Sequence, residues 1–288
     1  MDGGYTAADI CMKQGYRNLA EWLRNQRKLT MREAEDVGPS GTYYNGTGLV
    51  IFLNYIRFVD ANQYRKGACK DKRNIITTFN NLGYSIDYHE NLSKPKTISI
   101  LENLKQDKRL CFKDSLILII NSHGEDRKTF FTSDGGTHDI NEIKILFTNT
   151  NCPQMKNKPK LLITNFCRGK SQERVTNIEN VDNVSQEMEI STINDAESTR
   201  STPLMIELST HLGVICSVSE GVLSCRSEKT GSFFLQYICE TLGNNPEEEL
   251  NVIINTVADK MKATRLPHPT DLYERPFRKF VFKLRDAN

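Results

Sequence analysis

Residues 160–170 read KLLITNFCRGK, and this stretch decides the fold. Its apolar run Leu161–Ile163 is too short for a helix, so it predicts a buried strand that stops at polar residues and a glycine. Open α/β sheets place their chemistry just beyond the carboxyl ends of their strands, and Cys167 lies at such a position. The stretch therefore predicts an α/β sheet with a cysteine at its functional edge.

A second buried strand is predicted upstream, at Ser115–Ile120, and it runs into His123 and Gly124. Two neighbouring parallel strands would carry His123 and Cys167 to the same edge of one sheet. A thiol with its ordinary pKa near 8.5 is mostly protonated at neutral pH, so an adjacent imidazole is needed to take its proton and later give it to a leaving amine. The backbone N–H groups of Gly124 and Cys167 could stabilise the oxyanion. The pattern predicts acyl transfer by a Cys–His dyad.

The alternative interpretation is an inert thiol. A single cysteine at a strand end is more often packed and unreactive, since free cysteine is among the most buried residue types. Here the functional interpretation is favoured instead, because Ser-His-Gly follows one strand and Cys-Arg-Gly follows the next. The two motifs together favour an active-site dyad or the remnant of one.

Composition excludes several classes of protein. The 288 residues suit one large α/β domain, and a net charge of +2 gives no reason to expect a nucleic-acid or membrane partner. No apolar stretch is long enough to span a membrane and the start lacks a signal peptide, which predicts a cytoplasmic protein. The eight cysteines have no metal-ligand spacing, so we expect reduced thiols and neither metal nor cofactor.

The chain divides into four predicted sections. Residues 1–40 form a short leader, 41–169 a large section, 170–203 a flexible linker without aromatic residues, and 204–288 a small section. Strands and helices alternate through both larger sections, which predicts a three-layer α/β/α sandwich. The expected strands lie near 48–54, 84–88, 115–120, 161–163, 211–218 and 277–284, the helices at 72–82, 97–108, 141–147, 232–242 and 247–261, and a hairpin or turn at 130–138.

Three motifs resemble the caspase family, from about Gly41 to Leu284. Residues 165–169, NFCRG, match the caspase signature Gln-Ala-Cys-x-Gly at three of five positions, and His123 lies roughly 50 residues upstream, as the signature requires. The RKG at 65–67, followed by Asp71, resembles the family's Arg-Ser-Gly segment before its first long helix. The SCR at 224–226 resembles its Ser-Trp-Arg segment. The resemblance implies a mostly parallel six-stranded sheet.

The resemblance also implies an acid-binding pocket. In caspases, two arginines and the glutamine two places before the nucleophile grip the aspartate that precedes the cleaved bond, and Arg65, Arg226 and Asn165 match those positions. A planar guanidinium can bind a carboxylate through two parallel charge-assisted hydrogen bonds. Either arginine alone is more simply a solvated surface charge. Both together favour the pocket.

Processing and pairing follow from the same resemblance. Family members are cut after aspartate between their two sections, which points to Asp182 and Asp195 in the linker, and Asp36 is a candidate site for removal of the leader. Caspases pair two copies through the last strand of the sheet. That strand would be about Phe280–Leu284 here, giving a homodimer or a heterodimer with another caspase.

Three residues depart from the family pattern. Asn165 is one methylene shorter than glutamine, so its bond to a substrate carboxylate would need a bridging water or a shifted loop; losing such a bond costs ~1–3 kcal/mol. Phe166 replaces alanine, so its ring must find new room in the core or strain the loop, and Cys225 replaces a tryptophan that shapes neighbouring subsites. Two functions therefore stay open. One is a caspase-type endopeptidase that cuts after aspartate in programmed cell death, which the intact His123 and Cys167 favour. The other is a weakly active or inactive homologue that pairs with and regulates an active caspase.

Overall fold

The structure is a computed structural model of the chain. It describes Met12, Lys13, Arg17, Tyr43 and residues 47–169, 211–273 and 277–282. Apart from Met12, Lys13 and Arg17, the predicted leader (1–40) lies outside the described residues, as does all of the linker (170–203). The proposed processing sites Asp36, Asp182 and Asp195 lie outside them as well.

One six-stranded sheet runs through both larger sections of the chain, in the order β10-β7-β6-β3-β1-β2. Neighbouring strands are parallel except β10, which is antiparallel to β7. The strands are β1 (Gly48–Asn54), β2 (Ser85–Glu90), β3 (Ser115–Asn121), β6 (Lys160–Asn165), β7 (Leu212–Cys216) and β10 (Thr270–Tyr273). Every residue of β1, β3, β6 and β7 is buried, as expected for parallel strands covered on both faces. The predicted fold class is confirmed.

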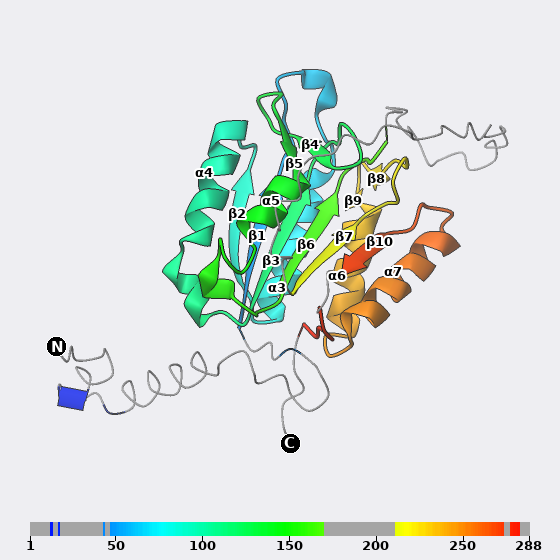
Figure 1. The fold of residues 1–288 in the computed structure, drawn as a ribbon. Coiled ribbons are helices and arrows are strands. Elements are labelled where there is room, and N and C mark those ends of the chain that lie inside the picture. The colour runs from blue at the N-terminus through cyan, green and yellow to red at the C-terminus, as the bar shows by residue number, and fades with distance from the viewer. Residues whose placement is uncertain are drawn as a thin grey trace, which may run out of the picture.

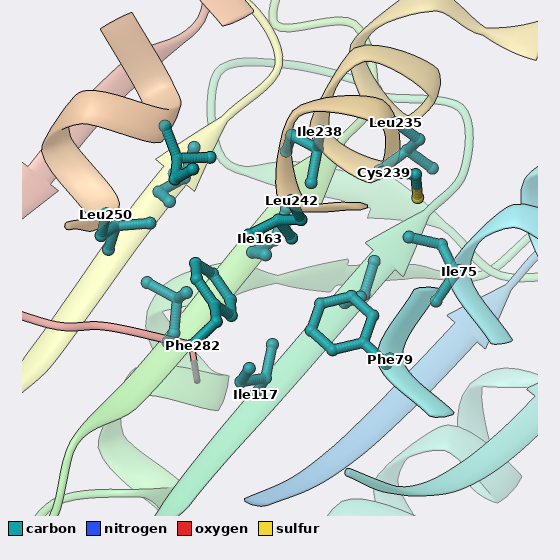
Figure 2. Close-up of a cluster of buried hydrophobic side chains, with 14 of the residues drawn as sticks. Ile75, Phe79, Ile117, Ile163, Leu235, Ile238, Cys239, Leu242, Leu250 and Phe282 are labelled. Carbon is teal, nitrogen blue, oxygen red and sulfur yellow. The ribbon is translucent and has the colours of Figure 1, made fainter. Parts of the chain in front are cut away.

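Three helices cover one face of the sheet. They are α3 (Ala68–Asn81), α6 (Phe233–Asn244) and α7 (Leu250–Ala263). Their apolar sides pack on alternate residues of the strands, such as Ile117 of β3 and Ile163 of β6, and Figure 2 shows these two among Phe79 of α3 and Leu242 of α6. The alternation places every second strand residue in this layer.

The opposite face carries α4 (Lys94–Lys105) and α5 (Ile140–Leu146), as Figure 1 shows. Leu101 of α4 and Ile143 of α5 are buried in a second core cluster with the intervening strand residues, among them Leu118. Among the described residues, none of the helices is long and apolar enough to cross a membrane. The sheet is thus the middle layer of three, as the sequence predicts.

Two small hairpins lie beside the sheet. The predicted turn at 130–138 is a hairpin of β4 (Thr129–Phe131) and β5 (Thr137–Asp139), and β8 (Arg226–Ser227) pairs with β9 (Gly231–Ser232). Helix α3 begins four residues before its predicted start at residue 72, and Gly67, the residue before it, has a left-handed backbone with φ 85°. A side chain there would also lie 2.4 Å from the carbonyl oxygen of Ser227, so glycine is required where the two segments meet.

The predicted final strand at 277–284 is wrong where the structure describes it. Phe280 and Phe282 are each 1% exposed, and their ring centroids are 5.0 Å apart within the core (Figure 2 labels Phe282). Their carbonyl oxygens accept hydrogen bonds from Leu250 N (2.7 Å) and Tyr84 Oη (3.0 Å), which uses the groups that a free strand edge would present. Residues 280–282 are therefore not the last strand of the sheet, and residues 283 and 284 of that prediction lie outside the described residues. The outermost strand at this end of the sheet is β10.

Candidate active site

The ends of β3 and β6 bring two predicted site segments together. The strands are parallel, with Asn121 opposite Asn165, so the residues that follow each strand leave the sheet side by side. A Cβ placed on Gly124 would lie 1.7 Å from the carbonyl oxygen of Cys167. Only a glycine allows so close an approach of the two backbones. His123 and Cys167 thus belong to adjoining segments at the carboxyl edge of the sheet, and both are half-buried.

The imidazole of His123 is held by the loop that follows β1. Its Nε2 lies 2.9 Å from the carbonyl oxygen of Gln63, and its ring centroid is 5.1 Å from that of Phe58. A carbonyl oxygen can only accept, so Nε2 carries the hydrogen and donates it. In the neutral ring Nδ1 then carries the lone pair, which is the form that can accept a proton.

The phenyl ring of Phe166 has found room in the core. It is 1% exposed, and its centroid lies 5.8 Å from that of Phe130, which in turn lies 5.6 Å from Tyr55. The predicted alternatives for this residue were new room in the core or a strained loop. The buried ring satisfies the first, and Cys167 beside it stays half-buried rather than fully enclosed.

Arg65 is buried under the same edge. It is 3% exposed, and it donates from Nη1 to the carbonyl oxygen of Tyr55 (3.0 Å) and from Nη2 to Oδ1 of Asn121 (2.5 Å). Burial lowers the pKa of Arg65 and the nearby Arg226 lowers it further, while Asp71 and Cys167 raise it. Arg226, Asp71 and Cys167 are thus the charged or ionisable groups that act on the guanidinium of Arg65.

Asp71, in the first turn of α3, is the buried acid beside the arginines. Its Oδ1 accepts a hydrogen bond from Ser232 N (2.8 Å) and its Oδ2 accepts one from Nδ2 of Asn121 (3.0 Å). Burial raises the pKa of Asp71, whereas Arg65 lowers it. Ser232 pairs with Arg226 in the β8–β9 hairpin, so Asp71 also ties that hairpin to α3.

The amide of Asn165 is engaged on both sides. Its Nδ2 donates to Oδ1 of Asn121 (2.7 Å), and its Oδ1 accepts from Oγ of Ser224 (2.9 Å). Arg168 N also donates to the carbonyl oxygen of Val222 (3.1 Å). These bonds hold the segment before β8 against the segment around Cys167. Arg226, which belongs to the small section, therefore lies at the sheet edge that β3 and β6 of the large section form.

Cys225 lies near the candidate nucleophile. It is half-buried, burial raises the pKa of its thiol, and the proximity of Cys167 raises that pKa further. Within the described ranges, no cluster of three or more histidine, cysteine, aspartate or glutamate side chains could hold a metal ion.

Comparison with known proteins decides the family. The family described as "Caspase domain" matches residues 47–280. The chain belongs to the caspase family. Caspase Dronc of Drosophila melanogaster is 24% identical over 213 residues, and Caspase-2 of Gallus gallus is 27% identical over 193 residues. These alignments cover 70% and 66% of the chain but only 46% and 45% of the two relatives.

The fold of this caspase-family chain also matches a solved structure. The crystal structure of Caspase-1 from Spodoptera frugiperda superposes with a TM-score of 0.67 at 18% sequence identity. The match covers 87% of this chain and 96% of the other. At that identity the likeness concerns the fold, and it agrees with the caspase-like sheet predicted from the sequence.

Sequence reasoning missed part of the network under this edge. Asn121 and Asn54 were not predicted as site residues, although Asn121 contacts both Arg65 and Asn165. A signal was present, because three apolar strands, LVIFLN at 49–54, LILIIN at 116–121 and LLITN at 161–165, each end in asparagine. Only the register of the sheet reveals that these asparagines are neighbours.

Proposed function

We propose that this chain is a cysteine endopeptidase that cleaves proteins after aspartate. The caspase family is a family of cysteine peptidases that act on proteins, and this supports the general reaction. One observation carries the specific proposal: Arg65 and the hairpin that carries Arg226 are joined through Asn121 and Asp71, at the sheet edge that carries the cysteine and the histidine. A cationic pocket beside a nucleophile selects an acidic side chain next to the reacting bond.

The proposed chemistry is acyl transfer. His123 takes the thiol proton of Cys167 at Nδ1, and the sulfur attacks the substrate carbonyl carbon. The backbone N–H groups of Gly124 and Cys167 donate to the oxyanion that forms. The imidazolium returns its proton to the leaving amine, which leaves a thioester on Cys167. Water, deprotonated by His123, then hydrolyses the thioester and releases the acid product.

Charge balance explains the preference for aspartate. Arg226 disfavours the charge of Arg65, and Asp71 supplies one negative charge that acts on both arginines. A substrate carboxylate would supply a second negative charge and relieve the repulsion between the two arginines. Arg65, Arg226 and Asn165 are the proposed pocket, in which the arginines contact the substrate and Asn165 supports them from beneath.

The wider proposal follows the family. We place the protein in the cytoplasm, in programmed cell death, as a precursor processed at Asp182 or Asp195 and at Asp36. Caspases form dimers, and we propose a homodimer or a heterodimer with another caspase. The last strand of the sheet, through which caspases pair, is β10 rather than the segment 280–282.

Release of a fluorophore from Asp-ending tetrapeptides tests the enzyme. The full-length chain should hydrolyse them, and Cys167→Ala should lower kcat/KM by at least ~10³-fold because the nucleophile is gone. The matched Asn-ending tetrapeptide should be a poor substrate, since it cannot pair with the arginines. Equal rates for the native chain and Cys167→Ala would remove the proposal.

A regulator with little activity is the second candidate. The observation in its favour is that Asn165 already bonds both Asn121 and Ser224, which limits what its amide can offer a substrate. Such a chain would bind an active caspase and change that enzyme's rate while failing to hydrolyse any tetrapeptide itself. A binding assay against an active caspase, run beside the hydrolysis assay, separates the two candidates.

A further inference from the structure

Three asparagines form a ladder beneath the candidate active site. Asn54, Asn121 and Asn165 end the adjacent parallel strands β1, β3 and β6, and each is in register with the next. Nδ2 of Asn165 donates to Oδ1 of Asn121 (2.7 Å), and Nδ2 of Asn121 donates to Oδ1 of Asn54 (2.9 Å). All three are almost completely buried. Buried amides of this kind persist only when their hydrogen bonds are made, so the ladder is a fixed part of the edge.

Asn121, in the middle of the ladder, has every amide position used. Its Oδ1 accepts from Asn165 and from Nη2 of Arg65, while its Nδ2 donates to Asn54 and to Asp71. An amide offers two donors and two acceptor sites, so this one is saturated. If the Asn121 amide were rotated by half a turn, its NH₂ group would face the donors of Asn165 and Arg65, and its oxygen would face the acceptors of Asn54 and Asp71. Its orientation, and therefore the place of its oxygen, is determined.

That oxygen fixes Arg65. The guanidinium is held at Nη2 by Asn121 and at Nη1 by the carbonyl oxygen of Tyr55, so two of its five N–H groups are used and its plane is set. The bond to Asn121 is the shorter of the two, at 2.5 Å against 3.0 Å. A rigid fork is what bidentate recognition of a carboxylate requires, because misdirected N–H groups cannot reach both oxygens.

The same amide is connected to Arg226 by two routes. Through Nδ2 it bonds Asp71, whose other oxygen accepts from N of Ser232, the residue paired with Arg226 in the β8–β9 hairpin. Through Oδ1 it bonds Asn165, whose oxygen accepts from Ser224, two residues before Arg226. Asn121 is therefore hydrogen-bonded directly to Arg65. Two successive hydrogen bonds, through Asp71, link it to the hairpin that carries Arg226.

We infer that Asn121 is the positioning residue of the acid-binding pocket: it holds Arg65 at a set place relative to Arg226, and thereby sets the preference for a carboxylate. This inference rests on the proposed function and names the residue that makes its pocket work. Asn121 does not touch the substrate in this account. Asn165 is linked to Arg65 through Asn121, so the amide on the adjacent strand is the one that holds the arginine.

The test measures binding without catalysis. In the full-length chain carrying Cys167→Ala, the affinities of an acetylated tetrapeptide ending in Asp and of one ending in Asn are measured by calorimetry. With Asn121 intact, the Asp-ending peptide should bind at least tenfold more tightly. Asn121→Leu keeps the size of the side chain and removes its polar atoms. It should reduce the ratio of the two affinities, Asp-ending over Asn-ending, to about threefold or less. A residue that served stability alone would weaken both peptides equally and leave the ratio unchanged.

Two further variants make the test independent of any loss of stability. Asn149 bonds Asn157 near the amino end of β6, the opposite end from the pocket, and Asn149→Ala should keep the native ratio. Asn121→Ala should abolish the preference for the Asp-ending peptide over the Asn-ending one. Asn121→Ala combined with Asn165→Gln should restore at least half of the logarithm of the native affinity ratio, because the longer amide can reach Arg65. If Asn121→Leu does not fold, this pair decides the question.

The outcomes separate the inference from the proposed function. Failure of the Asp-ending peptide to bind better than the Asn-ending one when Asn121 is intact would overturn both, since no acid-binding pocket would exist. A clear preference for Asp that survives Asn121→Leu, or that the longer amide at 165 does not restore after Asn121→Ala, would overturn the inference alone.

Discussion

Gly124→Ala is expected to lower kcat/KM for an Asp-ending tetrapeptide by 10²-fold or more, on the order of the loss of an oxyanion donor. The new Cβ would lie 1.7 Å from the carbonyl oxygen of Cys167 and 2.8 Å from its carbonyl carbon. Both are backbone atoms, so no side chain can turn away to make room. The ends of β3 and β6 must separate, which moves His123 and the N–H of Gly124 away from Cys167. A displacement of about 1 Å at reacting groups already costs ~10²-fold in rate.

Gly243→Ala is the matched control for that substitution. Gly243 lies in α6, and a Cβ there meets nothing within 4 Å. Alanine should leave activity unchanged and raise the free energy of unfolding by ~0.5–1 kcal/mol, the usual difference between glycine and alanine inside a helix. Hydrolysis by Gly124→Ala within tenfold of the native rate would contradict the close approach of the two backbones.

Asp71→Asn should lower the free energy of unfolding by ~3–5 kcal/mol, the usual cost of removing one partner from a buried charge pair. The substitution keeps the size of the side chain but removes the negative charge that offsets the buried Arg65 and the nearby Arg226. It also sets an N–H against either Ser232 N or Nδ2 of Asn121, both of which donate to Asp71. Urea denaturation at neutral pH measures the change.

An exposed aspartate provides the comparison. Asp259 lies on the solvent side of α7, and Asp259→Asn should change the free energy of unfolding by less than ~0.5 kcal/mol, as surface substitutions usually do. A loss below ~1 kcal/mol for Asp71→Asn would show that Arg65 does not depend on this carboxylate, and the charge balance proposed for the pocket would have to be abandoned.

The buried strands were predictable because their burial leaves a simple pattern. Strands β1, β3 and β6 are covered on both faces, so their residues are almost continuously apolar. The edge strand was mispredicted because residues 277–284, FRKFVFKL, mix aromatic and basic side chains as a half-buried strand would. Phe280 and Phe282 instead fill the core without joining the sheet. The true edge strand β10, with the sequence TDLY, is four residues long and carries too little apolar pattern to be recognised.

The site was predictable where chemistry is tied to one position and unpredictable where it depends on register. His123, Cys167 and Arg65 stand in motifs that can be identified along the chain. Asn54 and Asn121 look like ordinary polar residues that stop an apolar run. They gain a role only because parallel pairing sets them beside one another and beside Asn165, and no local pattern encodes which strands will be neighbours.

A crystal structure of the chain with an Asp-ending peptide aldehyde would test the central claim most directly. We predict a bond between Sγ of Cys167 and the former aldehyde carbon, the resulting oxygen within hydrogen-bond distance, ~3 Å, of the N–H of Gly124, and the aspartate carboxylate between Arg65 and Arg226. A peptide bound to another cysteine, or a carboxylate that contacts neither arginine, would contradict the account.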